Sequence, residues 1–328
     1  MTIRKTLAGV VAGIACLASH GAAAQGASSF PTRAIRIIVP FSPGASDTQI
    51  RTLGPLMSKR LNGQPIVVEN SPGGGGIVGA NIVRHAPPDG YTLFFTGAAG
   101  LTLLPALRAD VPYKLRDFVA IGNVSSLPGV LVVRADAPYR TMAEIVAYAR
   151  KHPGKINFGS AGVGTASHTF GVGPQVFGDF RFTHVPYKGM ADVIQAILAG
   201  TVDAGFAIPG LVMPYLQAGK LRAIAVSSAK RSEFLPDVPT YREAGIDYVD
   251  GESYGLVGPK GVPPAIVKQV SDALAESMKA PEFVNLMQKL YTSVDYVAPG
   301  PYQEMLEARD RSWHEYLANP AFRQLMQQ

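Results

Sequence analysis

Residues 34–50, AIRIIVPFSPGASDTQI, have the pattern of a strand, a loop and a helix start. The apolar run Ile35–Val39 predicts a buried strand, and apolar residues recur at helical spacing through Thr48–Leu61. The loop between them, Pro40–Asp47, has almost no reactive side chain. Backbone N–H groups at a helix start carry partial positive charge, and a loop without bulky side chains lets a carboxylate approach them. The stretch therefore predicts an anion-binding loop, with a plain strand-to-helix turn as the alternative.

A second stretch, residues 154–170 (GKINFGSAGVGTASHTF), repeats this layout of strand, Gly/Ser loop and helix start. Strand-like and helix-like segments alternate along the chain, which predicts an α/β fold with mainly parallel sheets and helices on both faces. Ligands of open α/β sheets bind at the carboxyl ends of strands, so two such loops facing each other predict a cleft. The expected strands are Ile35–Val39, Ile66–Glu69, Thr92–Thr96, Gly129–Arg134, Ile156–Ser160, Phe182–Val185, Ala204–Ile208 and Leu221–Val226. The expected helices are Thr48–Leu61, Gly76–Ala86, Thr141–His152, Thr165–Phe177, Ala191–Ala199 and Pro264–Met278.

The composition is that of a folded chain. Its 328 residues suffice for one large or two medium domains, and 47% hydrophobic with 16% charged residues leave little sign of disorder. The formal net charge of +6 is spread without a Lys/Arg run, which argues against a nucleic-acid surface. A mild positive excess suits a protein that collects small anions.

The N-terminus has the features of a secretory signal. Arg4 and Lys5 precede an apolar stretch, Leu7–Leu17, and an A-x-A site ends at Ala24. We therefore expect residues 1–24 to be removed on export.

The only cysteine, Cys16, lies inside this signal. The residue three positions before it is Gly13 rather than a branched aliphatic residue, which argues against a lipoprotein anchor. A mature chain without cysteine has no disulfide, no thiol nucleophile and no cysteine metal site.

Six motifs carry a family resemblance. In chain order they are VPFSPGASD, VVENSPGGGGIVGANIVRHAPPDGYTL, NFGSAGVGTASH, THVPYKG, LRAIAVSSAKRSEFLPDVPTYREAG and YGLVGPKGVPPAIV. On these motifs the chain resembles the Bug family, the periplasmic solute-binding proteins of tripartite tricarboxylate transporters. The resemblance implies a non-enzymatic, flytrap-like protein whose two domains close on a small aliphatic or aromatic carboxylate, without a cofactor. It also implies a membrane permease as partner, and we expect a monomer. The expected domains are 30–127 plus 252–328, and 128–251.

The resemblance also implies where the ligand binds. The loops Phe41–Asp47 and Ser160–His168 would hold one carboxylate, partly through backbone groups and ordered waters. The expected ligand-binding residues are Phe41, Ser42, Gly44, Ala45, Asp47, Thr96, Gly97, Ala98, Ser160, Gly164, Thr165, His168, Tyr187 and Ala207.

Several of these residues have a structural alternative. The helix is expected to start at Ser46 or Asp47, so Asp47 could be an N-cap or first-turn acid instead of a ligand-binding residue. We favour the N-cap or first-turn role. Ser160 and Thr165 are also typical of ST turns, and His168 of a packed histidine.

Departures from the family pattern bear on the ligand. Ala45 stands where a second glycine is frequent, Phe170 and Val172 replace smaller or acidic residues, and Tyr254 stands where tryptophan is common. We expect these changes to reshape the distal part of the site towards an aromatic or longer ligand.

Other functions have weaker support. The same receptor could serve a sensor kinase instead of a permease. GESYG, Gly251–Gly255, fits a nucleophile elbow with Ser253, and Asp295 and His314 follow in hydrolase order, but no helix is expected directly after the serine. A G-x-G-x-x-G match at Gly74–Gly79 lacks the acid that a nucleotide ribose needs, so we expect these glycines to allow close packing.

Overall fold

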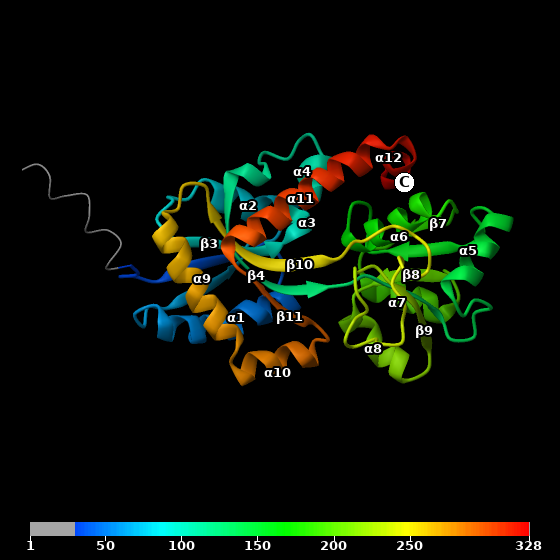
Figure 1. Ribbon diagram of the computed structural model, residues 1–328, viewed down its shortest axis with the longest axis horizontal. Coiled ribbons are helices and arrows are strands. Elements are labelled where there is room, and N and C mark those ends of the chain that lie inside the picture. The colour runs from blue at the N-terminus through cyan, green and yellow to red at the C-terminus, as the bar shows by residue number, and fades with distance from the viewer. Residues whose placement is uncertain (1–29, 328) are drawn as a thin grey trace, which may run out of the picture.

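The computed structural model describes residues 30–327, so the expected signal peptide and Cys16 lie outside the described residues. Two lobes lie side by side, each built around one sheet (Figure 1). The first sheet has six strands in the order β11-β4-β10-β3-β1-β2. These are β1 (Ile35–Val39), β2 (Ile66–Asn70), β3 (Thr92–Gly97), β4 (Phe118–Leu127), β10 (Glu252–Pro259) and β11 (Ser293–Val297).

The second sheet has five strands in the order β7-β6-β8-β5-β9. These are β5 (Val130–Arg134), β6 (Asn157–Ser160), β7 (Thr183–Pro186), β8 (Ala204–Ala207) and β9 (Leu221–Val226). The expected two-lobed α/β fold is confirmed, but the expectation of mainly parallel sheets was wrong. Parallel pairs join β1 to β2 and β3, and β6 to β7 and β8, whereas β4, β5, β9, β10 and β11 pair antiparallel. The sheets are mixed because the strands next to the crossings between the lobes run antiparallel to the strands of the βα units.

Helices cover both faces of each sheet. They are α1 (Ala45–Arg60), α2 (Ile77–Arg84), α3 (Ala98–Leu101), α4 (Leu103–Leu107), α5 (Met142–Lys151), α6 (Ala166–Phe177), α7 (Met190–Ala199), α8 (Pro209–Gln217), α9 (Pro264–Met278), α10 (Pro281–Lys289), α11 (Pro299–Ala318) and α12 (Pro320–Met326). Two short 3₁₀ turns, Gly74–Gly76 and Leu115–Asp117, precede α2 and β4. None of the helices within residues 30–327 combines the length and the apolar character needed to cross a bilayer.

Alternation along β1 explains the two layers of the first lobe. Ile37 and Val39 enter a core with α1, α9 and α10, whereas Ile38 enters a separate core with α2, α3 and α11. Successive side chains of a strand point to opposite faces, so an uninterrupted apolar strand needs helices on both sides.

The chain passes between the lobes more than twice. It leaves the first sheet after β4, returns at β10, and passes above the lobes again where α11 leads into α12 (Figure 1). Helix α12 packs against α6 of the second lobe. Trp313 of α11 and Phe322 of α12 are buried in one cluster with Leu103 and Val172, which come from different lobes. The C-terminal segment, expected to belong wholly to the first domain, thus holds both lobes.

Candidate functional site

The loop after β1 leaves a helix start uncovered. Helix α1 begins at Ala45, and its preceding residue, Gly44, offers no side chain to cap it. Ser42, Gly44 and Ala45 are exposed. The N–H of Thr48 donates to the carbonyl of Gly44 at 2.8 Å, so the three N–H groups before it have no partner inside the helix. Such a terminus attracts anions.

The buried carboxylate of Asp47 stabilises this loop through hydrogen bonds. It is buried, 5% exposed, and accepts hydrogen bonds from Arg51 Nε at 2.9 Å and from Asn70 Nδ2 at 2.8 Å. Asn70 Nδ2 also donates to the carbonyl of Phe41 at 2.9 Å. Asp47 is a first-turn acid, as expected, and not the N-cap, because the helix starts earlier than Ser46. Asn70 was missed because it meets Asp47 only once β2 lies beside β1. Arg51 was missed although it follows Asp47 by four residues in α1, a spacing that places the two side chains next to each other on a helix.

The end of β3 supplies a second loop at the same sheet edge. Thr96, Gly97 and Ala98 are buried there. The carboxylate of Glu252 accepts from the N–H of Ala99 at 3.3 Å, and burial raises the pKa of Glu252. This acid, which the sequence analysis did not identify, therefore occupies one of the N–H groups that begin α3.

Tyr254 brings the loops after β1 and β3 together. It pairs with Gly97 in the register of β10 and β3, and its ring centroid lies 6.2 Å from that of Phe41. The tyrosine that replaces the family's tryptophan thus lies between the two expected binding segments.

In the second lobe, the loop after β6 is closed by its own hydrogen bonds. Ser160 Oγ lies 2.6 Å from His184 Nε2, and Thr165 Oγ1 donates to the carbonyl of Gly162 at 2.7 Å. Gly162 and Gly164 have φ of 122° and 77°, a region that favours glycine. Helix α6 follows with Thr165 as its N-cap residue, whose side chain does not cap it. The first N–H groups of α6 are therefore also left without a side-chain acceptor.

His168 is a packed histidine. It is fully buried, its ring stacks on that of His184 with centroids 4.1 Å apart, and its Nδ1 accepts from the N–H of Gly164 at 3.1 Å. Burial, together with the neighbouring His184, lowers the pKa of His168 to about 3. The ring is neutral at physiological pH and holds the loop in shape.

Tyr187 and Ala207 lie at the ends of strands on either side of β6. Tyr187 is half-buried, and its N–H donates to the carbonyl of Ser160 at 2.8 Å. Ala207 is buried as the last residue of β8. Because β7, β6 and β8 are parallel neighbours, these residues and the loop after β6 share one edge of the second sheet.

The loops of the two lobes come into contact. A Cβ placed on Gly164 would lie 3.1 Å from Leu107 Cδ2 of α4, so the loop after β6 touches the segment that follows β3. Among residues 30–327, no hydrogen bond or ion pair joins residues 41–47 to residues 160–168.

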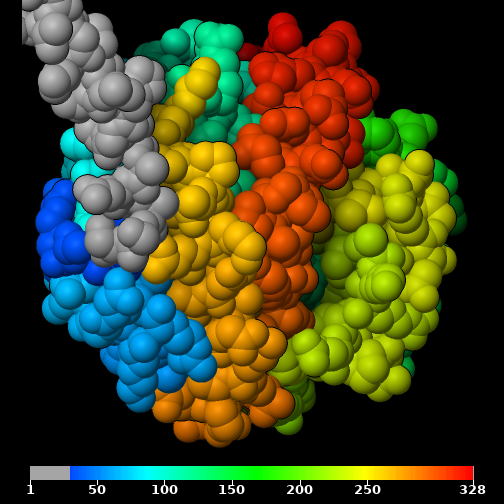
Figure 2. Space-filling view, turned by 60° about the vertical axis from the view of Figure 1, so that its left-hand side comes forward, coloured from blue at the N-terminus to red at the C-terminus, as the bar shows by residue number. Residues whose placement is uncertain are grey.

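A hollow of about 620 Å³ lies between the lobes, beside α11 and the segment that leads from the second lobe into β10. Figure 2 shows it between α11, in orange-red, and the yellow-green surface of the second lobe. Its lining includes Glu252, Ser253 and Arg309, and Ala98 is the one expected ligand-binding residue that reaches it. The hollow is therefore separate from most of the expected site.

The hydrolase alternative fails on geometry. Ser253 is buried as the second residue of β10, paired with Ser126 of β4, and the strand continues after it to Pro259 instead of giving way to a helix. Asp295 accepts from Ser126 Oγ at 2.5 Å, and His314 faces Asp310 at 3.8 Å on the exposed side of α11. The three residues do not form a triad.

The glycine-rich match also has a structural role. A Cβ on Gly79 would lie 3.1 Å from the ring of Phe94 and 3.2 Å from Pro40. Close packing of α2 on the sheet explains this glycine, as expected.

Comparison with known proteins identifies the family. Residues 50–315 match the family described as tripartite tricarboxylate transporter family receptor, TctC. The chain belongs to this family. A relative from Cupriavidus necator, described as the UPF0065 protein in the gbd 5' region, is 36% identical over 304 residues, which cover 90% of each chain. The family consists of periplasmic binding proteins, which are not enzymes.

Solved structures of similar sequence share the fold. The periplasmic binding protein BugD is 30% identical with a TM-score of 0.72, covering 88% of this chain and 98% of BugD. MatC from Rhodopseudomonas palustris, with bound malate, is 29% identical with a TM-score of 0.73, covering 87% and 99%. Another R. palustris protein, with adipate, is 26% identical with a TM-score of 0.74, covering 88% and 97%.

Proposed function

We propose that this TctC-family receptor is exported, binds a linear aliphatic dicarboxylate between its lobes and delivers it to a tripartite tricarboxylate transporter permease. The observation that carries the proposal is the uncapped start of α1 at the exposed residues Gly44 and Ala45, where no side chain of residues 30–327 caps the helix. The start of α6, after the loop Ser160–Thr165, supplies a matching set of N–H groups from the other lobe. One carboxylate held by both helix starts would draw the lobes together, because neither lobe alone satisfies it.

The proposed domains are 30–127 with 252–328, and 128–251, joined where β4 and β10 leave the first sheet, with α12 reaching across to pack on α6 of the second lobe. In this arrangement the ligand-binding residues are those expected from the sequence, with Asp47 and His168 acting indirectly. Asp47 fixes the loop after β1 through Asn70, and His168 fixes the loop after β6 through Gly164.

The ligand's chain is proposed to be aliphatic. The expected widening by Phe170 and Val172 finds no support, because both side chains are about 1% exposed and lie in core clusters. Of the three large side chains that depart from the family pattern, Phe170, Val172 and Tyr254, Tyr254 is the one that lies beside an expected binding loop. Relatives with malate and with adipate support a ligand of four to six carbons.

The test is a thermal-shift and calorimetric screen of the mature protein after unfolding and refolding, which removes any retained ligand. Succinate, malate, adipate and citrate are compared with butyrate and benzoate. A ligand at one hundred times its Kd adds about 2.7 kcal/mol to the free energy of unfolding. A shift with the dicarboxylates only supports the proposal. Absence of a shift with every di- and tricarboxylate would overturn it. Light scattering with and without ligand tests the proposed monomer.

A further inference from the structure

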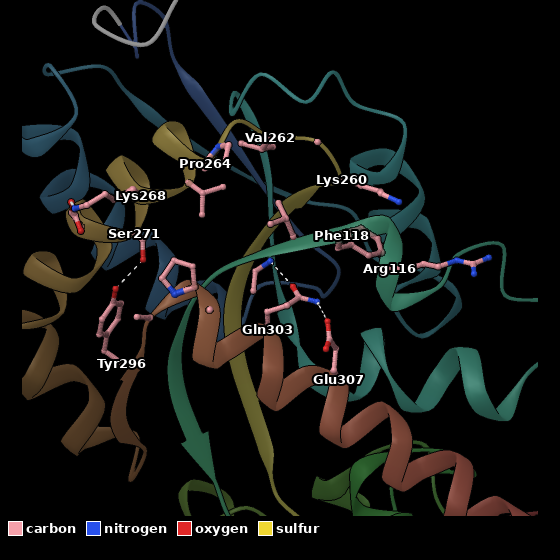
Figure 3. Close-up of a pocket in the computed structure, with 18 residues that line it drawn as sticks. Arg116, Phe118, Lys260, Val262, Pro264, Lys268, Ser271, Tyr296, Gln303 and Glu307 are labelled. Carbon is pink, nitrogen blue, oxygen red and sulfur yellow. Dashed lines mark hydrogen bonds and ion pairs between the residues drawn. The ribbon is translucent and has the colours of Figure 1, made fainter.

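A groove of about 840 Å³ lies on the first lobe, between α9 and the start of α11 (Figure 3). It contains none of the residues expected to bind the dicarboxylate. Its apolar lining includes Phe118, Val119, Ala120, Val262, Val267 and Tyr296. A concave site of this size with a mainly apolar lining surface is typical of a small-molecule pocket.

The groove exists because β11 covers only half of β4. Strand β11 pairs with Asn123, Ser125 and Ser126, and the first half of β4 has no strand on that side. Its backbone is nevertheless satisfied there. The N–H of Ala120 donates to Gln303 Oε1 at 3.1 Å, and the carbonyl of Ile121 accepts from Ser271 Oγ at 2.6 Å. The groove therefore does not need an added peptide strand.

Some charged side chains of the groove have a bonding partner and others do not. Lys268 pairs with Asp272 at 2.6 Å, and Glu307 accepts from Gln303 Nε2 at 3.0 Å. Arg116 and Lys260 are exposed and make no ion pair within residues 30–327. Figure 3 shows both at the same end of the groove, beside Phe118, with Lys268 at the opposite end.

We propose that this groove is a second ligand site, which binds an amphiphilic monoanion such as a medium-chain alkyl carboxylate. The alkyl chain would lie on Val119, Val267 and Tyr296. The carboxylate would lie beside Arg116 and Lys260, the cations that lack a partner. An alkyl chain would cover the apolar lining of the groove. A single carboxylate would match the positive charge of Arg116 and Lys260 at one end.

The test is isothermal titration of the refolded full-length mature protein with hexanoate, octanoate and decanoate below their micellar concentrations, and with decanol. Each added CH₂ that is buried should tighten binding by up to about fourfold. Decanol should bind about tenfold more weakly than decanoate, because it lacks the charge. Equal binding of all the carboxylates, equal binding of decanol and decanoate, or no binding below millimolar concentration would overturn the proposal.

Variants locate the site. Arg116→Gln with Lys260→Gln should weaken decanoate binding about tenfold. Gly300→Trp should block the groove, because Gly300 lines it and a Cβ there meets nothing within 4 Å. The matched control is Lys151→Gln with Lys155→Gln, exposed cations on the second lobe. Unchanged decanoate binding in both groove variants would overturn the location. The groove variants and the control should all still bind the dicarboxylate. The test of the groove is therefore independent of the proposed transport function.

Discussion

Arg309 donates a 2.6 Å hydrogen bond to Asp250 and thereby ties α11 to the segment that leads from the second lobe into β10. Asp250 is only 3% exposed in its side chain, and its other oxygen accepts from Thr169 of α6 at 2.9 Å and from Tyr248 at 3.0 Å. A single carboxylate therefore joins α11, α6 and the return crossing.

Arg309→Met should destabilise the protein by about 3 kcal/mol, because it leaves the buried Asp250 without its cation. Urea unfolding of the mature protein measures the loss. The control is Arg242→Met, which breaks an exposed pair with Asp247 and should change stability by at most about 1 kcal/mol. Equal losses in the two variants would contradict a special role for Asp250.

Stability should fall as the pH drops below 6.5, in part because of His168. The pKa of this residue is about 3 when folded and about 6.5 when unfolded, so between these values the unfolded chain binds the extra proton. Its contribution is complete above pH 6.5 and declines by up to about 1.4 kcal/mol per pH unit on acidification. Urea unfolding from pH 7 to pH 5 should show a shallower slope for His168→Asn, which keeps an acceptor near Gly164. Identical slopes would refute the assignment.

Gly44→Leu should fold normally and lose dicarboxylate affinity. The φ of Gly44 is −178°, which any residue adopts, and a Cβ there would meet only Ser42 O at 3.8 Å. The added side chain would cover the start of α1, so we expect affinity to fall by at least about tenfold, or 1.4 kcal/mol. Calorimetry measures it, with Gly300→Leu as the control at another open glycine. Wild-type affinity in Gly44→Leu would remove α1 from the site.

Asp47→Ala should cost about 2 kcal/mol of folding stability, because Arg51 and Asn70 lose a shared acceptor. Dicarboxylate affinity should also decrease, since Asn70 positions the carbonyl of Phe41. The exposed Asp110→Ala, paired with Arg108, is the stability control. Thermal melts and calorimetry give both quantities. A change in affinity without a change in stability would point instead to direct ligand contact.

Ser253→Ala should leave stability within about 0.5 kcal/mol of the wild type, because its buried hydroxyl has no hydrogen-bond partner. Neither protein should hydrolyse nitrophenyl esters. Hydrolysis by the wild type that disappears in Ser253→Ala would revive the enzyme hypothesis.

Local pattern predicted the βα units well. Ile35–Val39, Leu221–Val226 and Pro264–Met278 have the bounds expected from the sequence, and the other expected elements differ at their ends by three residues or fewer. These segments combine an apolar period with Gly or Pro at their ends, so short-range rules suffice.

The strands that join the lobes were harder to predict. Strand β4 contains Asn123 and Ser125 among apolar residues, and its pairing with β10 is broken by two register shifts. An irregular pairing removes the strict alternation on which strand prediction depends. The bounds of α11 and α12 were not predicted either, although these two helices together hold the lobes.

The order of the βα units and the family could be recognised from the amino-acid sequence, because both depend on residues close together in the chain; the export signal stays a prediction. The mixed sheets, the buried Asp47–Asn70 contact and the Arg309–Asp250 bond depend on the packed fold. Their partners lie 23 and 59 residues apart, and such groups become neighbours only after the sheets and helices have packed. Burial then determines whether a polar side chain binds a ligand or supports the loop that does.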